Sequence, residues 1–236
     1  DSSGDQSVAG LDVLRIVSVE DVGEFVQDNI IPSSVEEAIC AFILGGAARA
    51  KRGKGDSPCT MLVHTSHRIA DQAPAKKLID DRFRELKDLW RYDRKSGIRR
   101  KLESLWNKDF APTSAGIEGS PQHNFVDVEP FIGPFMEAVV VREINSETGD
   151  VLDFEREPSL KAIAVGGNRL ARGLTLEGLL VSFFARRSPQ YDTLLQMARW
   201  YGYRAGYEDL TRIYTTRELA GWFTDLALVE YRLRQD

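Results

Sequence analysis

The sequence predicts an α/β protein built on a parallel sheet that is flanked by helices. Two observations support this prediction. Continuous apolar runs bounded by glycine or arginine, typical of strands buried on both faces, occur at Lys161–Gly166 and Leu179–Ala185. Between and after such runs lie longer segments whose apolar residues recur at helical spacing. Strands that alternate with helices are the pattern of a parallel sheet with helices on both faces.

The first half of the chain contains two predicted strands and two predicted helices. Leu11–Val19 is rich in β-branched and apolar residues, which favours a short strand. A helix is expected from about Val35 to Ala48, where early acidic residues precede an apolar segment. Thr60–His64 predicts a second strand that opens into a polar loop. Apolar residues at helical spacing then predict a long helix over about Ala75–Trp106.

The second half follows the same alternation, after a loop that is expected at the Gly-, Ser- and Pro-rich segment Ala111–His123. The remaining predicted elements are strands at Glu137–Ile144, Lys161–Gly166, Leu179–Ala185 and Thr211–Tyr214, and helices at Tyr191–Tyr203 and Arg217–Leu233. We expect one domain over residues 31–236 with a helical insertion at about 75–110, preceded by a linker and lead-in strand in residues 1–30. Because the chain opens in polar sequence without Met, we also expect it to be a piece of a longer protein.

The composition excludes several classes of protein. The chain of 236 residues has 31 basic and 36 acidic side chains, and this net charge of -5 argues neither for nor against nucleic acid. No apolar run approaches the roughly 20 residues that a membrane-spanning helix needs, so we expect no membrane partner. Cys40 and Cys59 are the only cysteines, which excludes a disulfide scaffold and a tetrathiolate zinc site. They fit a reducing compartment, and we expect a cytoplasmic protein.

Neither a phosphate-binding loop nor a metal site is predicted. The pattern G-x-x-x-x-G-K-[ST] does not occur, and in the nearest segment, Arg52–Gly55, a glycine follows the lysine where a magnesium-binding hydroxyl is needed. His64 and His67 lie close to Cys59 in the sequence. Their spacing on a strand does not converge, and a fourth ligand is missing nearby, so we expect no metal site.

A nuclease or a serine hydrolase finds little support in the sequence. Asp153, Glu155 and Glu157 could imitate the clustered carboxylates of a nuclease, but acids that connect two strands are usually just solvated. The nucleophile pattern G-x-S-x-G is absent.

Two segments of the second half combine residue types that suit a functional site. Asn168–Gly178 follows one predicted strand directly, and Gln196–Arg204 lies on the helix after the next strand. The carboxyl ends of parallel strands are where α/β sheets place their sites, and a glycine lets the backbone approach a ligand closely. The candidate residues of the first segment are Asn168, Arg172, Gly173 and Thr175.

In their order and residue types, these two segments resemble motifs V and VI of superfamily-two helicases, the DEAD-like ATP-driven motors. Ala171–Leu174 (A-R-G-L) matches the first of these motifs, with Thr175 where the family usually has aspartate. Together with Pro32–Ala38 (P-S-S-V-E-E-A) and Thr60–Ser66 (T-M-L-V-H-T-S), they are more closely similar to the Z-one domain. This resemblance covers roughly Ile31–Leu233.

The resemblance implies a function as part of a motor. The Z-one domain is the second motor lobe of a family of bacterial helicase-like ATPases, and some members are motor subunits of NTP-dependent restriction endonucleases of the CglI type. The implied fold is a RecA-like lobe that completes an NTP cleft. The implied cofactors are ATP, or another NTP, and Mg, held mainly by an upstream RecA-like lobe of the same protein. The other implied partners are double-stranded DNA and a separate nuclease subunit.

The arginines of the second segment are the candidate catalytic residues. Phosphoryl transfer builds negative charge on the transferred group, and a guanidinium inserted from a second lobe can stabilise that charge. Arg199 and Arg204 are the candidates for this role, and Gln196 could bind the nucleotide or the facing lobe. The two arginines lie further apart than those of the helicase motif, so either could be the finger. Alternatively, both are surface arginines, and the aromatic residues beside them pack in the core.

Two other segments are candidates for DNA contact. Thr65 and Ser66 follow a predicted strand, and in related motors this loop touches the phosphate backbone, although such hydroxyls could equally cap the next helix. The run Arg91–Lys101 holds six basic residues, with Trp90, Tyr92 and Trp106 nearby. It could follow DNA phosphates or bind an acidic subunit. Its candidate DNA-backbone residues are Arg94, Arg99 and Arg100.

Two other functions stay open at this point. The domain could itself be the nuclease, which would require a carboxylate cluster that binds a divalent metal. It could also be a protein-docking module without motor action, in which case the arginines of Gln196–Arg204 would be dispensable.

Overall fold

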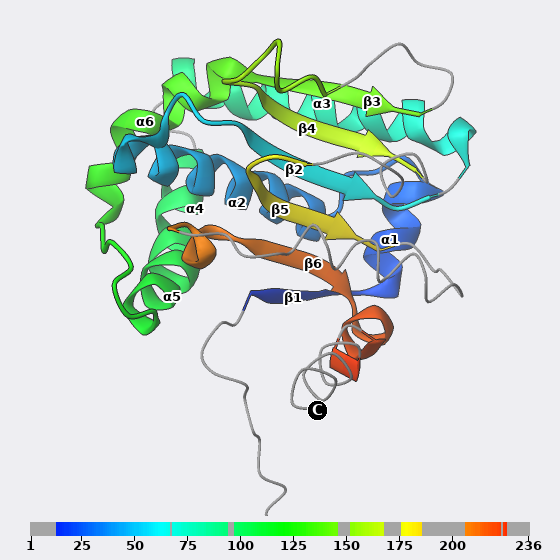
Figure 1. Ribbon diagram of the computed structural model, residues 1–236. Helices are drawn as coiled ribbons and strands as arrows, with labels where there is room; N and C mark the ends of the chain where they lie inside the picture. The colour runs from blue at the N-terminus through cyan, green and yellow to red at the C-terminus, as the bar shows by residue number, and fades with distance from the viewer. Residues whose placement is uncertain are drawn as a thin grey trace, which may run out of the picture.

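The computed structural model describes residues 13–66, 68–93, 97–145, 152–167, 176–185, 206–222 and 224–225. Its centre is a six-stranded sheet in the order β1-β6-β5-β2-β4-β3, in which every strand runs parallel to its neighbours (Figure 1). The strands are β1 (Leu14–Val17), β2 (Cys59–His64), β3 (Val139–Ile144), β4 (Lys161–Gly166), β5 (Leu179–Phe184) and β6 (Arg212–Thr216). The α/β fold class predicted from the sequence is confirmed, and the sheet is consistent with a RecA-like lobe.

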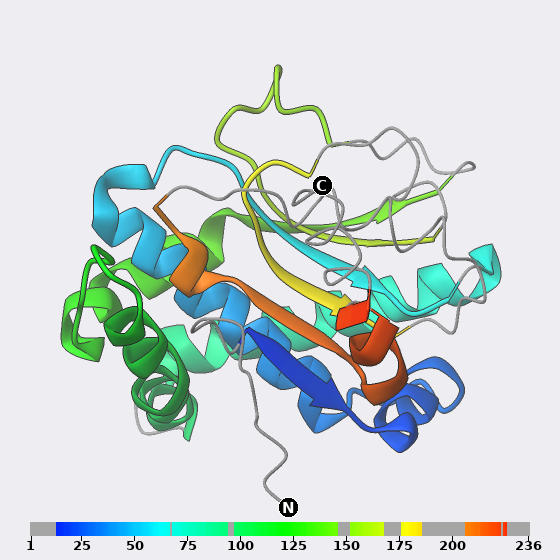
Figure 2. The same cartoon turned by 60° about the horizontal axis from the view of Figure 1, so that its bottom comes forward.

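Helices connect the strands and cover one face of the sheet (Figures 1 and 2). They are α1 (Val19–Val26), α2 (Ser33–Arg49), α3 (Ile69–Tyr92), α4 (Gly97–Leu105), α5 (Ala111–Gly116) and α6 (Phe125–Ala138). Short turns continue α2 as η1 (Ala50–Lys54), continue α4 as η2 (Trp106–Phe110) and precede β6 as η4 (Glu208–Leu210). Among these described segments, no helix has both the length and the apolar character needed to cross a bilayer.

The strands bury alternate residues on the two faces of the sheet. Met61 and Val63 of β2 belong to the large cluster formed with α2, α3 and α6, whereas Leu62 between them belongs to a second cluster. In β4, Ile163 faces the first cluster and Ala162 the second. The connection between β3 and β4 covers part of the second cluster through Leu152 and Leu160. All six residues of β2 are therefore buried, which accounts for the apolar run Met61–Val63 at its centre.

The connection between β2 and β3 differs from the sequence prediction in three places. The single helix predicted over Ala75–Trp106 is two helices, and α3 begins ahead of Pro74, whose missing N–H removes only one helical hydrogen bond. The loop predicted at Ala111–His123 contains α5. The third difference is α6, which the sequence analysis does not predict because Pro130 and Pro134 interrupt the helical pattern.

Tertiary contacts explain why α6 is helical despite its prolines. The carboxylate of Asp127 accepts a hydrogen bond from the backbone N–H of Asn124 at 3.0 Å, which stabilises the first turn. Phe135 packs directly on Gly46 of α2: a Cβ added at that glycine would lie 2.0 Å from the ring. The burial of α6 against α2 outweighs the two hydrogen bonds that the prolines cannot make.

A buried ionic cluster joins the helical connection to the two strands β1 and β6. Asp109 of η2 accepts hydrogen bonds from Arg212 at 2.9 Å and from the Nε of Arg15 at 3.3 Å. The side chain of Arg212 is 0% exposed and that of Asp109 is 8% exposed. Nη1 of Arg212 donates to two backbone carbonyls at 2.6 and 2.9 Å, and Nη2 donates to the hydroxyl of Thr113 at 3.2 Å. The guanidinium lies over the ring of Phe110. The buried charge of Arg212 is therefore both paired and hydrogen-bonded.

A second buried pair extends this cluster to the end of α2. Arg52 of η1 donates two hydrogen bonds to the carboxylate of Asp209, at 2.8 and 2.5 Å. Ser114 of α5 also donates to Asp209, and Arg52 reaches the carbonyl of Pro121 at 3.0 Å. Together, the two pairs hold η1, α5 and η4 in one arrangement beside the start of β6.

Removal of Asp109 tests the first pair. In Asp109→Ala the guanidinium of Arg212 stays buried without its carboxylate, so the free energy of unfolding is expected to fall by about 3–5 kcal/mol. Urea denaturation measures this change. Asp81→Ala is the control, because Asp81 pairs with Lys77 on the exposed face of α3 and its loss should hardly matter. Equal effects of the two substitutions would contradict the importance of the buried pair.

Asp209 should make stability depend on pH. Burial alone would raise the pKa of this carboxyl, but hydrogen bonds from Arg52 and Ser114 outweigh burial and lower the pKa below its ordinary 3.8. The folded pKa is thus lower than the unfolded one, so the stabilisation is present above pH 3.8 and is lost as the pH falls through the folded value. Asp209→Asn should therefore lower the free energy of unfolding most at neutral pH. Urea denaturation at a series of pH values should show this difference shrinking in acid; a difference independent of pH would contradict the assignment.

Candidate functional site

The carboxyl ends of β5, β2 and β4 lie side by side at one edge of the sheet, because the three strands are parallel neighbours. Each precedes a segment that the sequence analysis singled out: Thr65 and Ser66 follow β2, Asn168–Thr175 follows β4, and Gln196–Arg204 comes after β5. Several candidate residues lie outside the described residues, namely Asn168, Arg172, Gly173, Thr175, Gln196, Arg199 and Arg204. The structure shows where the chain leaves β4 and β5 on its way to these segments.

His64 ties the three strand ends together. Its ring is fully buried, and Nδ1 lies 2.8 Å from the carbonyl oxygen of Gly166 at the end of β4. The ring also stacks on Phe184 of β5, with centroids 5.2 Å apart and planes 10° apart. Within the described residues, no three His, Cys, Asp or Glu side chains are grouped so that they could hold a metal ion. The structure therefore gives His64 a packing and hydrogen-bonding role at this edge.

The two hydroxyl residues after β2 differ in their contacts. Ser66 Oγ donates to the carboxylate of Asp71 at 2.5 Å and accepts from the backbone N–H of Arg68 at 3.1 Å. Ser66 thus joins the loop after β2 to the first turn of α3, but it does not cap this helix, whose N-cap residue is Arg68. Thr65 makes no side-chain hydrogen bond to a described residue, and it lines an open cleft. The hydroxyl of Thr65 is therefore open to a ligand directly, whereas a ligand at Ser66, which lines the same cleft, would have to displace Asp71.

This cleft has a volume of about 1330 Å³ and lies across the carboxyl ends of β1, β6, β5 and β2. One wall is apolar and includes Ile16 and Val19, which are 50% and 56% exposed. The polar and charged residues of the lining include Thr65, Arg68 and Arg217, together with the acidic residues Asp71 and Glu218. Neither arginine forms an ion pair with a described residue, and both are exposed. An exposed guanidinium is a group that can bind an anion such as a phosphate.

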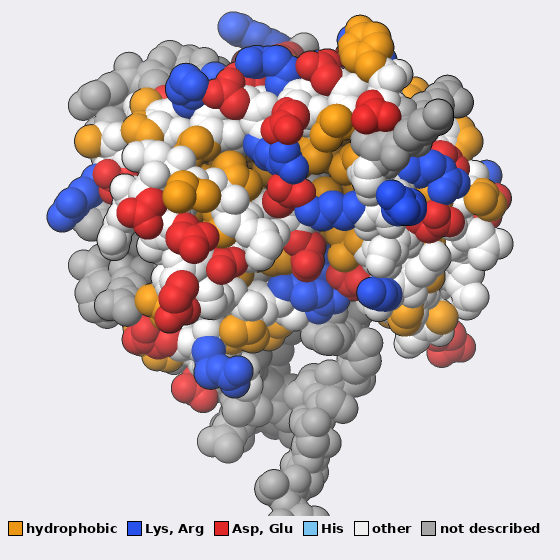
Figure 3. Space-filling view, turned by 180° about the vertical axis from the view of Figure 1, so that it is seen from behind, with side chains coloured by type: hydrophobic (Ala, Val, Ile, Leu, Met, Phe, Trp, Pro, Cys, Tyr) orange, Lys and Arg blue, Asp and Glu red, His pale blue; other side chains and the backbone are white. Residues whose placement is uncertain are grey.

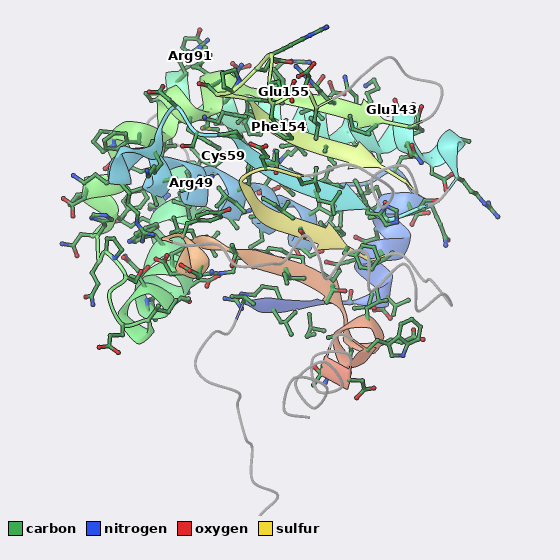
Figure 4. All side chains as sticks on the ribbon, viewed as in Figure 1. Arg49, Cys59, Arg91, Glu143, Phe154 and Glu155 are labelled. Atoms are coloured by element: carbon green, nitrogen blue, oxygen red, sulfur yellow. The ribbon has the colours of Figure 1, made fainter. Side chains whose placement is uncertain are left out.

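The basic run Arg91–Lys101 lies at the other end of the sheet. The 24-residue helix α3 starts at the carboxyl edge and, at 1.5 Å per residue, runs back about 36 Å to the amino ends of the strands. Its end is joined to the end of α6 by an ion pair between Arg91 and Glu137, just before β3 begins. Figure 4 shows Arg91 and Glu143 at opposite ends of the strands. The run is therefore separated from the cleft by the length of the sheet.

Acidic side chains of the same chain pair with several of these basic residues. Arg99 binds Glu129 at 2.7 Å and Glu103 at 2.8 Å. The hydrogen bonds to Glu129 contribute most to raising the pKa of Arg99. Lys101 pairs with Glu36 of α2. The rear surface accordingly shows basic and acidic side chains interspersed (Figure 3). These pairs attach α4 to α2 and α6.

The other candidate residues near this run have different surroundings. Arg100 is exposed and makes no ion pair with a described residue, whereas Arg94 lies outside the described residues. Trp106 is 1% exposed, stacks on Phe110 and donates its indole N–H to the carbonyl of His123 at 3.1 Å. Trp106 is thus part of the core, and DNA contact by this run stays a prediction that depends on Arg94, Arg99 and Arg100.

The two cysteines are buried, and two of the acidic residues considered for a nuclease form ion pairs. Burial raises the pKa of Cys40 to about 12, and burial also raises that of Cys59, which accepts a hydrogen bond from Arg49 at 3.4 Å (Figure 4). Neither thiol is therefore suited to act as a nucleophile at neutral pH. Among the acids that could imitate a nuclease, Glu157 binds Arg142 at 2.6 Å and Asp153 pairs with Arg156 at 3.4 Å.

The parallel sheet and the cleft at its carboxyl edge define an α/β domain with a site at the strand ends. A family model described as the Z1 domain matches residues 34–236. The match spans most of the chain, so the chain belongs to the Z1 domain family, as the four sequence motifs predicted. The same comparisons match the chain to no curated protein and to no solved structure.

Substitution of Arg99 and of Arg100 distinguishes a role in DNA binding from a role in packing. Arg100→Ala is expected to weaken DNA binding by the full-length protein and to reduce its salt dependence by about one phosphate contact, with an unchanged melting temperature. Arg99→Ala is expected to lower the melting temperature, because Glu129 and Glu103 lose their partner. Fluorescence anisotropy at several salt concentrations and thermal unfolding measure the two effects. Unchanged DNA binding with lost subunit assembly would assign the run to a protein partner.

Proposed function

We propose that this chain is the second motor lobe of a DEAD-type, NTP-dependent DNA translocase in a bacterial restriction system. Membership of the Z1 family supports the proposal. The observation that favours it most is the adjacency of the strand ends of β5, β2 and β4, from which the three motif-bearing segments follow. A motor lobe needs such an arrangement, since its nucleotide and DNA contacts must respond to each other.

In this proposal the NTP and Mg are held mainly by an upstream lobe. Arg52, in the segment whose sequence comes nearest to the phosphate-binding pattern, is bound to Asp209. The described residues of this chain contain no grouped ligands for a cation. This lobe instead supplies Arg199 or Arg204 to the phosphate, with Gln196 beside them, and Asn168–Thr175 as the coupling segment. When bound, the nucleotide supplies the phosphoryl group whose developing charge the guanidinium stabilises.

The DNA contacts of the proposed motor are assigned to the cleft. The hydroxyl of Thr65 and the guanidiniums of Arg68 and Arg217 face it and suit a phosphate backbone. Arg99 and Arg100 at the other end of the sheet, together with Arg94, which lies outside the described residues, would provide a second contact. The other proposed partners are double-stranded DNA and a separate nuclease subunit, in the cytoplasm.

The two alternative functions make different demands. A nuclease requires grouped carboxylates that hold a divalent metal, and no such group occurs among the described residues. A docking module without motor action requires no arginine finger. Substitution of the arginines in Gln196–Arg204 therefore distinguishes the docking alternative from the motor.

The test replaces each candidate arginine in the full-length protein. Arg199→Ala or Arg204→Ala is expected to lower DNA-stimulated NTP hydrolysis by on the order of a thousandfold, because the guanidinium stabilises charge that develops in the transition state. Nucleotide binding should be affected less, and Arg199→Lys should not restore activity if Arg199 is the finger, since an ammonium lacks the planar fork. A phosphate-release assay and thermal unfolding provide the measurements.

Arg84→Ala is the matched control for this experiment, because Arg84 is 58% exposed on α3 and pairs only with acids of its own helix. Normal hydrolysis by both single variants in the presence of DNA would refute the proposed role. Loss of activity that accompanies unfolding in both variants would refute it as well.

A further inference from the structure

Gln72 of α3 is a buried polar residue that the proposed function does not use. It is 4% exposed, and its Oε1 has no hydrogen-bond partner among the described residues. An unsatisfied buried carbonyl oxygen costs free energy, so a position that retains one needs an explanation. The amide of Gln72 lies against Gly167, the residue that follows β4.

Gly167 allows two loops to approach each other closely. A Cβ added there would lie 2.4 Å from Nε2 of Gln72 and 3.4 Å from the carbonyl oxygen of Ser66. At the ends of the two preceding strands, Nδ1 of His64 lies 2.8 Å from the carbonyl oxygen of Gly166. The loop after β2 and the loop after β4 are therefore in direct contact at Gly167, which is the residue immediately before Asn168–Thr175.

Ser66 connects this contact to the cleft. A serine hydroxyl has one proton to donate, and that of Ser66 is donated to Asp71, the residue before Gln72. A phosphate that took this proton would break the bond between Ser66 and Asp71. The first turn of α3, which contains Gln72, would then lose one of its attachments to the loop after β2.

We propose that Gln72 is a positioning residue that couples the Thr65–Ser66 loop to the segment beginning at Gly167. Phosphate binding at Ser66 releases Asp71, the first turn of α3 shifts, and Gln72 transmits this shift to Gly167. The proposal rests on the proposed motor function, because it assigns Gln72 to the communication between DNA contact and NTP hydrolysis. Gln72 touches neither DNA nor nucleotide in this scheme.

The first test measures coupling in the full-length protein. Gln72→Ala is expected to keep the wild-type melting temperature, DNA affinity and hydrolysis without DNA. The ratio of hydrolysis with DNA to hydrolysis without DNA should fall roughly two- to thirtyfold, the usual range for residues that couple two sites. Gln122→Ala, at an exposed glutamine, is the matched control. If Gln72→Ala is unstable, Gln72→Asn, which keeps the amide but is too short to reach Gly167, should give the same loss.

A second measurement does not depend on catalysis. DNA should change the deuterium uptake of peptides that contain Gly167 in the wild type, and this change should be lost in Gln72→Ala. Gly167→Ala should lower the melting temperature, and addition of Gln72→Ala should restore it, since the added Cβ would otherwise meet Nε2. Failure of this restoration would overturn the contact on which the proposal depends.

The outcomes separate this inference from the proposed function. A wild-type protein without DNA-stimulated hydrolysis would overturn both the motor function and the coupling. A wild type that is stimulated by DNA, together with a folded Gln72→Ala variant that is stimulated equally, would overturn the role of Gln72 alone.

Discussion

The buried pair of Asp109 and Arg212 is the interaction on which the arrangement of the helical connection depends. Arg212 opens β6, and Asp109 lies at the junction of α4 and α5, so one carboxylate joins the connection to the sheet. Arg15 of β1 binds the same carboxylate and thereby attaches the edge strand. Because a buried guanidinium without its carboxylate is costly, this cluster permits few alternative positions for the connection.

The charged side chains at the two ends of the sheet have different surroundings. At the amino ends, acids and bases of the same chain largely neutralise each other, as Arg52 with Asp209 and Arg99 with Glu129 illustrate. At the carboxyl ends, the exposed Arg68 and Arg217 border an open cleft.

The contacts described at the carboxyl edge of the sheet are mainly contacts between neighbouring strands and helices. His64 joins β2 to β4 and β5, and Gln72 brings α3 against the residue after β4. Such contacts suit a lobe whose loops must move together. They are consistent with the proposal that this chain contributes part of a motor site while an upstream lobe binds the nucleotide.

The sequence by itself determined the fold class, five of the six strands to within two residues at each end, and membership of the Z1 family. The strands could be predicted because strands buried on both faces, such as β2, β4 and β5, consist mostly of apolar residues. The sixth strand, β1, lies inside the predicted segment Leu11–Val19 but is shorter than that segment. Only the tertiary structure decided that α6 forms across Pro130 and Pro134, since packing on Gly46 outweighs local propensity. It alone also revealed the buried partners of Asp109 and the contact of Gln72 with Gly167, because these residues meet across long sequence separations that no local pattern records.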